Sequence, residues 1–417
     1  VIGVSICVLI IGVGTAWLIT NYNFTGKSFF EWALILPFAV PPYILAYTFT
    51  GLFDTFGTAN NLIRDVFFLG DDFTFFPKVR NIYGAIIVFS FTLYPYVYLV
   101  SRMAFLNQSR SILESGRTLG FNQFQVFYKL AVPMIRPAIV AGLMLVIMET
   151  LSDFGAVDHF AIATFTTGIF RTWYGMYDLE TAMQLASLLL IFVTIFIFIE
   201  RHSRRKAAFS IAGSVYKPLK LSQLVGYKNL LAFIACFLPI FIGFILPVLE
   251  LTYWALNYKL DFFNQKFIST ALNTLYLSLS AAFLCTLLAL IINFSIRYKT
   301  NNLLKFLSSF LTVGYAVPGL ILAIGVMRLL TFLDRNFTIE MFNLVLTGSL
   351  FGLMMAYIIK SYALSSSTFD AGFERISPRI DDVARSLKTS GWNLLLKVHV
   401  PLLKTSFLTS MLLVVAE

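Results

Sequence analysis

The chain has 417 residues, of which 58% are hydrophobic and only 12% charged, and its net charge is +10. An ordinary soluble domain has about 25% charged residues, so this composition excludes a water-soluble globular protein. Apolar runs of about 20 residues, long enough to cross a bilayer as helices, occur repeatedly. We therefore expect an all-α, polytopic transmembrane bundle.

Windows of about 19 residues give ten candidate spans. In chain order they are Val1–Thr20, Trp32–Phe53, Ile82–Val100, Ala138–Thr150, Gln184–Ile199, Leu230–Trp254, Ile268–Ile296, Phe306–Leu330, Leu344–Ile359 and Leu402–Glu417. The fourth is short. Both ends of the chain lie within spans and no basic leader precedes the first, so we expect no cleavable signal peptide and a missing span beyond each end.

The charges between the spans predict the topology, because cytoplasmic loops are rich in Lys and Arg. Basic residues outnumber acidic ones five to one in loop 102–136, seven to one in 200–228 and three to none in 297–305. Acidic residues prevail in 54–81, 151–183 and 331–343, which we therefore place outside. The positive charge thus reflects topology and indicates no nucleic-acid partner.

An internal repeat divides the chain. The stretch Glu114–Gly120 is followed 13 residues later by Pro133, and Asp382–Lys388, at an offset of 268, is followed at the same distance by Pro401. Ala-Val-Pro ending at Pro41 recurs ending at Pro318. An even number of spans separates the two loops, which predicts parallel repeats about an axis along the membrane normal. We expect a first repeat in 1–200, a basic cytoplasmic linker in 201–228 and a second repeat in 229–417.

The first cytoplasmic loop predicts a short amphipathic helix. Phe121, Phe124 and Tyr128 fall on one helical face, and Trp392 and Leu396 match the last two in the second copy. Gly120 suits a tight turn before this helix, and Pro133 predicts a stop before the next span. The helix is either a docking knob for a partner protein or an interfacial helix on the lipid headgroups.

The Glu-x-x-Arg-x-Leu-Gly stretch with its downstream proline resembles the EAA loop of ABC importer permeases. The resemblance implies that two such loops seat in two cytoplasmic ATPase subunits. The matching positions are Glu114, Gly116, Arg117, Gly120, Phe124 and Pro133 in the first loop, and Asp382, Ala384, Arg385, Trp392 and Pro401 in the second. Asp382 and Lys388 replace the usual Glu and Gly, which puts the turn of the second loop in doubt.

A narrower resemblance is to the fused permeases of ferric-iron importers. It is carried by Met148–Gly155, Thr164–Gly168 and Phe170–Trp173, and it spans nearly the whole chain. This resemblance implies a bacterial inner-membrane protein with the type I, MetI-like permease fold and about twelve spans when intact. It also implies alternating access, with cargo delivered by a periplasmic ferric-iron-binding protein. Related fused permeases carry thiamine or phosphonates, which are alternative cargoes.

Four residues are candidates for the translocation pathway. Glu149 and Asp153, one turn apart at the outer end of the fourth span, border the outer mouth and attract a cation, or they are helix-end acids capped by water or paired with Arg171. Pro41 and Pro318 each lie inside a span and are expected to kink or interrupt its helix, for gating or for packing. Asp158 and His159 form either a metal contact or a solvated pair.

The sequence predicts no catalysis by this chain. Gly26-Lys27-Ser28 lacks the first glycine of a phosphate-binding loop, and no dinucleotide fingerprint, catalytic triad or HExxH is present. We expect no bound cofactor, with ATP used by a partner subunit, and no firm metal site. The cysteines Cys7, Cys236 and Cys285 lie in apolar runs as packed or lipid-facing thiols. A secondary transporter driven by an ion gradient is the alternative from another class.

Overall fold

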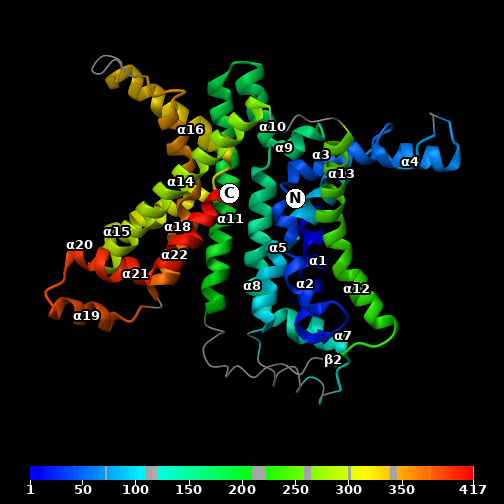
Figure 1. The fold of residues 1–417 in the computed structure, drawn as a ribbon, viewed down its shortest axis with the longest axis horizontal. Coiled ribbons are helices and arrows are strands. Elements are labelled where there is room, and N and C mark those ends of the chain that lie inside the picture. The colour runs from blue at the N-terminus through cyan, green and yellow to red at the C-terminus, as the bar shows by residue number, and fades with distance from the viewer. Residues whose placement is uncertain are drawn as a thin grey trace. The chain divides into compact units, whose positions relative to one another are not determined.

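The structure is a computed structural model that describes residues 1–70, 73–106, 108, 116, 118, 120–208, 222–257, 264–298, 302–338, 345–374 and 376–416. These residues form two compact units, Val1–Leu260 and Asp261–Glu417, which are described separately. The described residues are nearly all helical (Figure 1). The all-α prediction is therefore confirmed.

The first unit contains twelve α-helices among its described residues, together with one 3₁₀ segment, three π segments and two very short strands. The α-helices are α1 (Ile2–Asn21), α2 (Lys27–Ala33), α3 (Pro42–Phe53), α4 (Thr58–Phe67), α5 (Ile82–Leu106), α7 (Gln123–Gln125), α8 (Val132–Ser152), α9 (Gly155–His159), α10 (Phe165–Phe170), α11 (Leu179–Ala208), α12 (Tyr227–Ile240) and α13 (Leu246–Asn257). The others are η1 (Leu36–Ala39, 3₁₀), η2 (Val126–Ala131), η3 (Arg171–Gly175) and η4 (Phe241–Ile245), and the parallel pair β1 (Tyr22–Asn23) and β2 (Ser222–Gln223).

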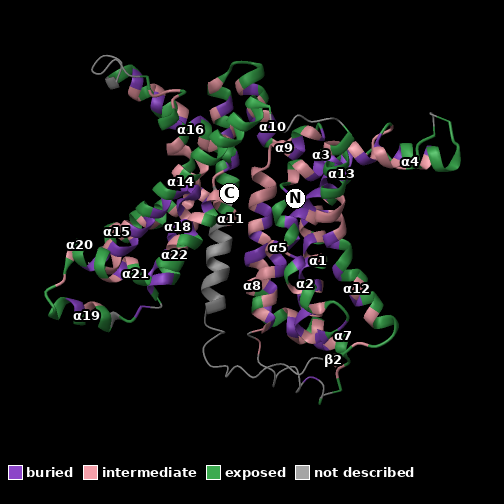
Figure 2. Ribbon diagram, in the orientation of Figure 1, coloured by how far each residue is buried: buried purple, intermediate pink, exposed green. Residues whose placement is uncertain are grey.

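The core of this unit is formed where α5 packs between α1 and α8 (Figure 2). Two glycines allow the close approach. A Cβ atom at Gly12 of α1 would lie 2.9 Å from Cβ of Val97, and one at Gly142 of α8 would lie 3.1 Å from Cα of the same valine. In a membrane, where burial of apolar surface drives helix association only weakly, such small residues are what lets backbones pack closely.

Helices α12 and α13 pack in the first unit. Nδ2 of Asn229 donates to Oγ1 of Thr25 at 3.0 Å, and the ring centroids of Phe30 and Phe233 lie 5.1 Å apart. At the other end Tyr47 and Trp254 stack edge to face at 5.3 Å. The sixth predicted span, which the sequence repeat assigns to the second half, thus packs against the first.

The second unit follows the same order of elements. It contains α14 (Gln265–Tyr298), α15 (Asn302–Leu311), the 3₁₀ segment η5 (Thr312–Ala316), α16 (Gly319–Leu333), η6 (Asp334–Thr338), α18 (Leu350–Glu374), α19 (Pro378–Ser386), α20 (Gly391–Leu394), η7 (Leu395–His399), α21 (Val400–Leu402) and α22 (Lys404–Ala416). Both bounds of α18 lie 268 residues after those of α5, because 350 − 82 and 374 − 106 each give 268. The 3₁₀ segments end at Ala39 and Ala316, 277 residues apart. Both offsets are those of the sequence repeat.

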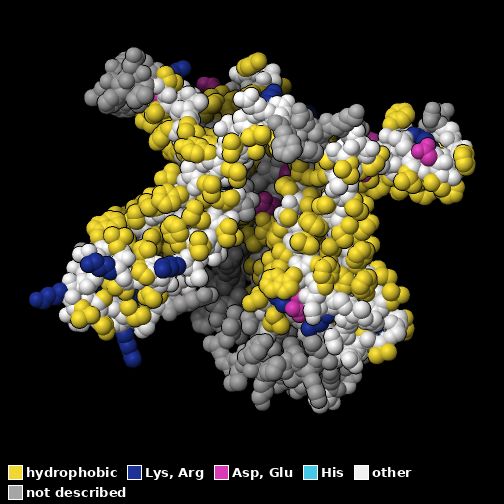
Figure 3. Space-filling view, in the orientation of Figure 1, with side chains coloured by type: hydrophobic (Ala, Val, Ile, Leu, Met, Phe, Trp, Pro, Cys, Tyr) yellow, Lys and Arg dark blue, Asp and Glu magenta, His cyan; other side chains and the backbone are white. Residues whose placement is uncertain are grey.

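Among the described residues, six helices are long and apolar enough to cross a membrane, or up to nine if three bent pairs each count as one span. The six cover Ile2–Asn21, Ile82–Leu106, Gln123–Ser152, Leu179–Phe196, Tyr227–Asn257 and Gln265–Tyr298, and Figure 3 shows hydrophobic side chains spread over the surfaces of both units. Helix α18, at the ninth predicted span, is not among these candidates. Ten spans therefore stay a prediction.

Candidate functional site

The second EAA-like segment is built on α19. Ser377 caps the helix, accepting from the backbone N–H of Arg379 at 3.4 Å, and Asp382 is exposed while Ala384 is buried. The helix ends where Lys388 adopts a left-handed conformation with φ of 58°. There the N–H of Thr389 donates to the carbonyl of Ala384 at 2.9 Å, which satisfies one of the carbonyls left over at a helix C-terminus.

The first EAA-like segment ends in the same way. Glu114 and Arg117 lie outside the described residues, but Gly120 has φ of 81°, and the N–H of Phe121 donates to the carbonyl of Gly116 at 3.0 Å. Gly116 and Phe121 are 268 positions before Ala384 and Thr389, so the two bonds are equivalent. Replacement of glycine by Lys388 therefore leaves the turn geometry unchanged. Gly116 is buried, and a Cβ atom there would overlap the side chain of Leu130.

A short helix follows each turn. Asn122 and Gln125 form a capping box at the start of α7, whereas Ser390, 268 positions after Asn122, is the N-cap residue of α20 without a side-chain cap bond to that helix. Each short helix continues through a π segment into a helix containing the expected proline in its first turn. The prediction that Pro133 stops the helix is wrong, because Gln123–Ser152 forms one apolar helical run. Proline is tolerated in a first turn, where its missing N–H has no partner to lose. The equivalent Pro401 precedes a 77° bend.

Each of these helices presents bulky apolar side chains outward. The rings of Phe124 and Tyr128 lie 5.2 Å apart, with Phe124 71% exposed, and Trp392 is 62% exposed beside Leu396. Phe121 is instead half-buried, with Nζ of Lys129 lying 5.1 Å from its ring centroid. The predicted apolar face is thus present as two exposed pairs, one per segment.

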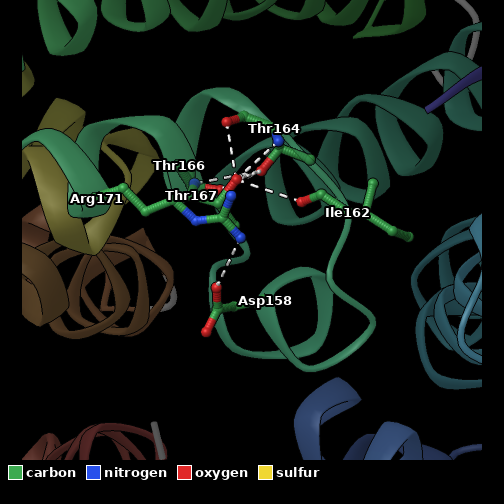
Figure 4. Close-up of polar contacts among 6 residues, drawn as sticks. All are labelled: Asp158, Ile162, Thr164, Thr166, Thr167 and Arg171. Carbon is green, nitrogen blue, oxygen red and sulfur yellow. Dashed lines mark hydrogen bonds and ion pairs between the residues drawn. The ribbon is translucent and has the colours of Figure 1, made fainter. Parts of the chain in front are cut away.

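At the end of α8, Asp153 acts as a helix cap. Its Oδ1 accepts the N–H groups of Ala156 and Val157 at 2.9 and 3.2 Å, and its carbonyl accepts from Oγ1 of Thr166 at 2.7 Å. Thr164 and Thr167 form a reciprocal capping box at the start of α10 (Figure 4). The threonine-rich stretch that resembles ferric permeases is therefore hydrogen-bonded to the end of α8 through Thr166.

The charges at this end are partly buried. Burial raises the pKa of Asp153 to about 6, against the lowering effect of its two backbone hydrogen bonds. Glu149 is half-buried one turn earlier on α8. Arg171 forms an ion pair with Asp158, in which Nη2 and Oδ1 are 3.9 Å apart, and Figure 4 shows the two side chains facing one another. A role of Glu149 and Asp153 at the mouth of a pathway stays a prediction.

His159 is held by side chains of α3. Its Nε2 lies 2.8 Å from Oγ1 of Thr50, and its ring lies against Tyr43 and Tyr47 with centroids 5.9 and 5.6 Å away. Burial lowers the pKa of His159, and the positive charge of Arg80 adds to this effect. No group of three or more His, Cys, Asp or Glu side chains suited to a metal ion occurs in the part of the chain that the structure describes.

Both predicted proline breaks are present. Pro41 separates η1 from α3 where the helix axis turns by 88°, and Pro318 separates η5 from α16 where it turns by 120°. At the second break Nζ of Lys360 donates to the carbonyls of Tyr315 and Val317 at 2.9 and 3.4 Å. Those carbonyls have lost helical partners, so the ammonium group stabilises the break. The prediction that each proline interrupts its helix is confirmed, and their gating role stays a prediction.

A large open cleft of about 1760 Å³ lies elsewhere in the first unit, between α3, α4 and α13. Glu250 of α13 is 5% exposed on its wall and accepts from Oγ1 of Thr58 at 2.6 Å. Sequence reasoning did not single out Glu250 or Lys360. A signal was available for Glu250, which is an ionisable residue within the predicted span Leu230–Trp254, whereas Lys360 directly follows the predicted span Leu344–Ile359.

Residues 9–207 match the family model described as binding-protein-dependent transport system inner membrane component. The chain is 27% identical over 392 residues to the Fe(3+)-transport system permease protein FbpB 2 of Haemophilus influenzae, with 92% of this chain and 70% of that protein covered. It is 24% identical to the ferric transport system permease protein FbpB of Actinobacillus pleuropneumoniae, covering 93% of this chain and 57% of the relative's length. A third of the chain is 30% identical to the sulfate transport system permease protein CysT of Escherichia coli, with 36% of this chain and 52% of that protein covered.

Proposed function

We propose that this chain is the permease of an ATP-driven importer of ferric iron, because residues 9–207 match the family model of binding-protein-dependent transport system inner membrane components and its first relatives are named for ferric transport. The protein is an inner-membrane protein of the transport class and not an enzyme. In the proposal its two halves are parallel repeats that enclose the pathway. A periplasmic binding protein delivers the cargo, and two cytoplasmic ATPase subunits drive the cycle.

The observation that carries the coupling part of the proposal is the matched construction of the two EAA-like segments. Each has a left-handed residue, at Gly120 or Lys388, an equivalent backbone bond across the turn, a short helix and an exposed apolar pair. Large apolar side chains left exposed on a folded segment mark a surface that another molecule covers. Two equivalent segments in one chain suit two equivalent partners, as two ATPase subunits provide.

The proposed mechanism is alternating access. Closure of the ATPase subunits moves the two EAA-like segments, which we also call the docking segments. Helices α8 and α22 follow because each segment leads into one of these helices. The breaks at Pro41 and Pro318 supply places where a span changes direction without unravelling. The chain's own residues bind and move, and the bond-breaking step belongs to the ATPase.

Single aspartate substitutions of Phe124 and Trp392 test the coupling proposal. Each places a charge in an exposed apolar position, so each should abolish copurification of the ATPase while leaving membrane insertion intact. Tyr227→Asp is the matched control, since Tyr227 is 70% exposed and lies outside both segments. Retention of the ATPase by both docking variants would refute the assignment, and transport without any ATPase would support the ion-driven class instead.

The cargo is tested separately. The first relatives are named for ferric transport, whereas shorter matches are named for sulfate and molybdenum transport. The cation Lys360 at the break before α16 favours an oxyanion as the second candidate. Proteoliposomes holding the complete importer should take up radiolabelled ferric iron, and uptake of molybdate or sulfate in its place would overturn the iron assignment alone.

A further inference from the structure

A buried ionic junction lies beneath the second docking segment. Nε of Arg297, at the end of α14, donates to Oδ2 of Asp381 in α19 at 2.7 Å. The other two guanidinium nitrogens donate to the carbonyls of Phe373 and Ile376, at 2.7 and 2.9 Å, where α18 ends. One arginine therefore binds α14, α18 and α19 together through charge-assisted hydrogen bonds, which are the strongest and most directional kind.

His399 completes the junction from the π segment η7. Its Nε2 lies 3.0 Å from Oδ1 of Asp381, its side chain is fully buried, and its ring lies 5.4 Å from those of both Phe294 and Phe373. Asp381 thus has one oxygen toward Arg297 and the other toward His399. The carboxylate joins α19 to α14 on one side and to η7 on the other. Arg385 of α19 makes a second contact with α14, its guanidinium carbon lying 5.3 Å from the ring centroid of Tyr298.

The first unit has an apolar contact at the equivalent place. Trp17 of α1 packs against Phe105 of α5 and Phe127 of η2, with ring centroids 5.2 Å apart in each pair. Applying the offsets of 277 and 268, Trp17 and Phe105 correspond to Phe294 and Phe373. The two halves therefore use the same three-way contact between a first span, a following span and a π segment. The position that corresponds to Asp381 in the first half is Leu113, which lies outside the described residues.

We propose that Asp381 is the positioning residue through which movement of the second docking segment is transmitted to α14 and α18. This inference rests on the proposed coupling function. An ion pair with short, directional bonds holds one geometry, so α19 moves with the spans as one body. An aromatic contact has no comparable directional bond and lets neighbouring helices slide. The second segment is thus tightly coupled to its half.

Mobility of α19 tests the contact itself. A spin label at Ser386→Cys, an exposed site near the end of α19, is introduced into the intact protein with Cys7 replaced by serine. Asp381→Asn keeps the shape and removes the charge, so the population of the mobile, detached segment should rise about tenfold or more. Asp370→Asn, an exposed carboxylate of α18 outside the junction, is the control. Equal mobility in the two variants overturns the proposal.

The ratio of cargo transported to ATP hydrolysed tests transmission. In proteoliposomes holding the complete importer, Asp381→Asn should lower this ratio roughly threefold or more, and Asp381→Glu should restore most of it because the carboxylate is retained. A mobile segment with an unchanged ratio overturns transmission through Asp381. If the unsubstituted protein shows no ATP-driven transport, the proposed function fails, and the mobility measurement still decides whether Asp381 holds the segment.

Discussion

Replacement of Lys388 by glycine should stabilise the turn that ends the second docking helix. Lys388 is exposed and has φ of 58°, a left-handed conformation that costs an L-residue about 1–2 kcal/mol and glycine almost nothing. Glycine also gains freedom in the unfolded chain, worth about 0.4–1 kcal/mol in the opposite direction. Taking the middle of each range, the net gain is about 0.8 kcal/mol, or roughly a fourfold change in the opening equilibrium.

Hydrogen exchange of a single amide measures this change. The Thr389 N–H bonds to the carbonyl of Ala384 across the turn, so its exchange should slow about fourfold in Lys388→Gly. Gly120→Ala is the reciprocal variant. No atom within 4 Å would meet its new Cβ, so any acceleration of Phe121 exchange comes from backbone strain alone. Unchanged exchange in both variants would refute the equivalence of the two turns.

Three further predictions concern the first unit. Burial raises the pKa of Asp153 from 3.8 to about 6, so ionisation of this carboxyl should destabilise the fold by up to about 3 kcal/mol as pH rises through that range. Asp153→Asn keeps the oxygen that caps α9 and should flatten the change in unfolding temperature between pH 5 and 7. The control is the exposed Asp158→Asn, which should leave that change as it is. Arg64 is 6% exposed and donates to three oxygens, so Arg64→Met should cost several kcal/mol locally and speed proteolysis within 54–70, and unchanged cleavage would contradict this. A Cβ atom at Gly51 would overlap the ring of Trp254, so Gly51→Val should separate α13 from α3 at a cost of about 1–3 kcal/mol and shift the emission of a chain with Trp254 as its one tryptophan to the red.

Hydropathy and repetition predicted much of the fold because they depend on local properties of the chain. Runs of apolar residues must be helical in lipid, where every backbone group needs an internal partner. Among the described residues, apolar helices therefore appear at six of the ten predicted spans, and at nine if each bent pair counts as one span. The Ala-Val-Pro recurrence likewise placed the breaks at Pro41 and Pro318, since proline cannot donate to the helical ladder. The same rule gave a wrong prediction at Pro133, which lies in the first turn of α8 and does not end a helix there.

The polar contacts could not be predicted because they depend on which helices meet. Arg297 and Asp381 are 84 residues apart and look like ordinary loop charges in the sequence. Lys360 directly follows the predicted span Leu344–Ile359, and the sequence does not show that its ammonium group binds the carbonyls of residues 315 and 317. Asp153 was expected at a mouth of the pathway, and its cap on α9 follows from a chain reversal that hydropathy does not record.

The two halves share their backbone design and differ in the side chains at their proline breaks, and this difference affects how the cycle is driven. At the proline break the second half has Lys360 where the first has Thr92, whose hydroxyl bonds only within its own helix, to the carbonyls of Val88 and Phe89. At the docking segment of the second half, Asp381 lies between Arg297 and His399. A contact that joins two elements is lost outright when one partner is replaced, whereas a bond within one helix leaves the neighbouring elements in place. If both halves were driven alike, equivalent substitutions should impair transport equally, and the difference at the proline break instead predicts that Lys360→Met impairs transport more than Thr92→Val.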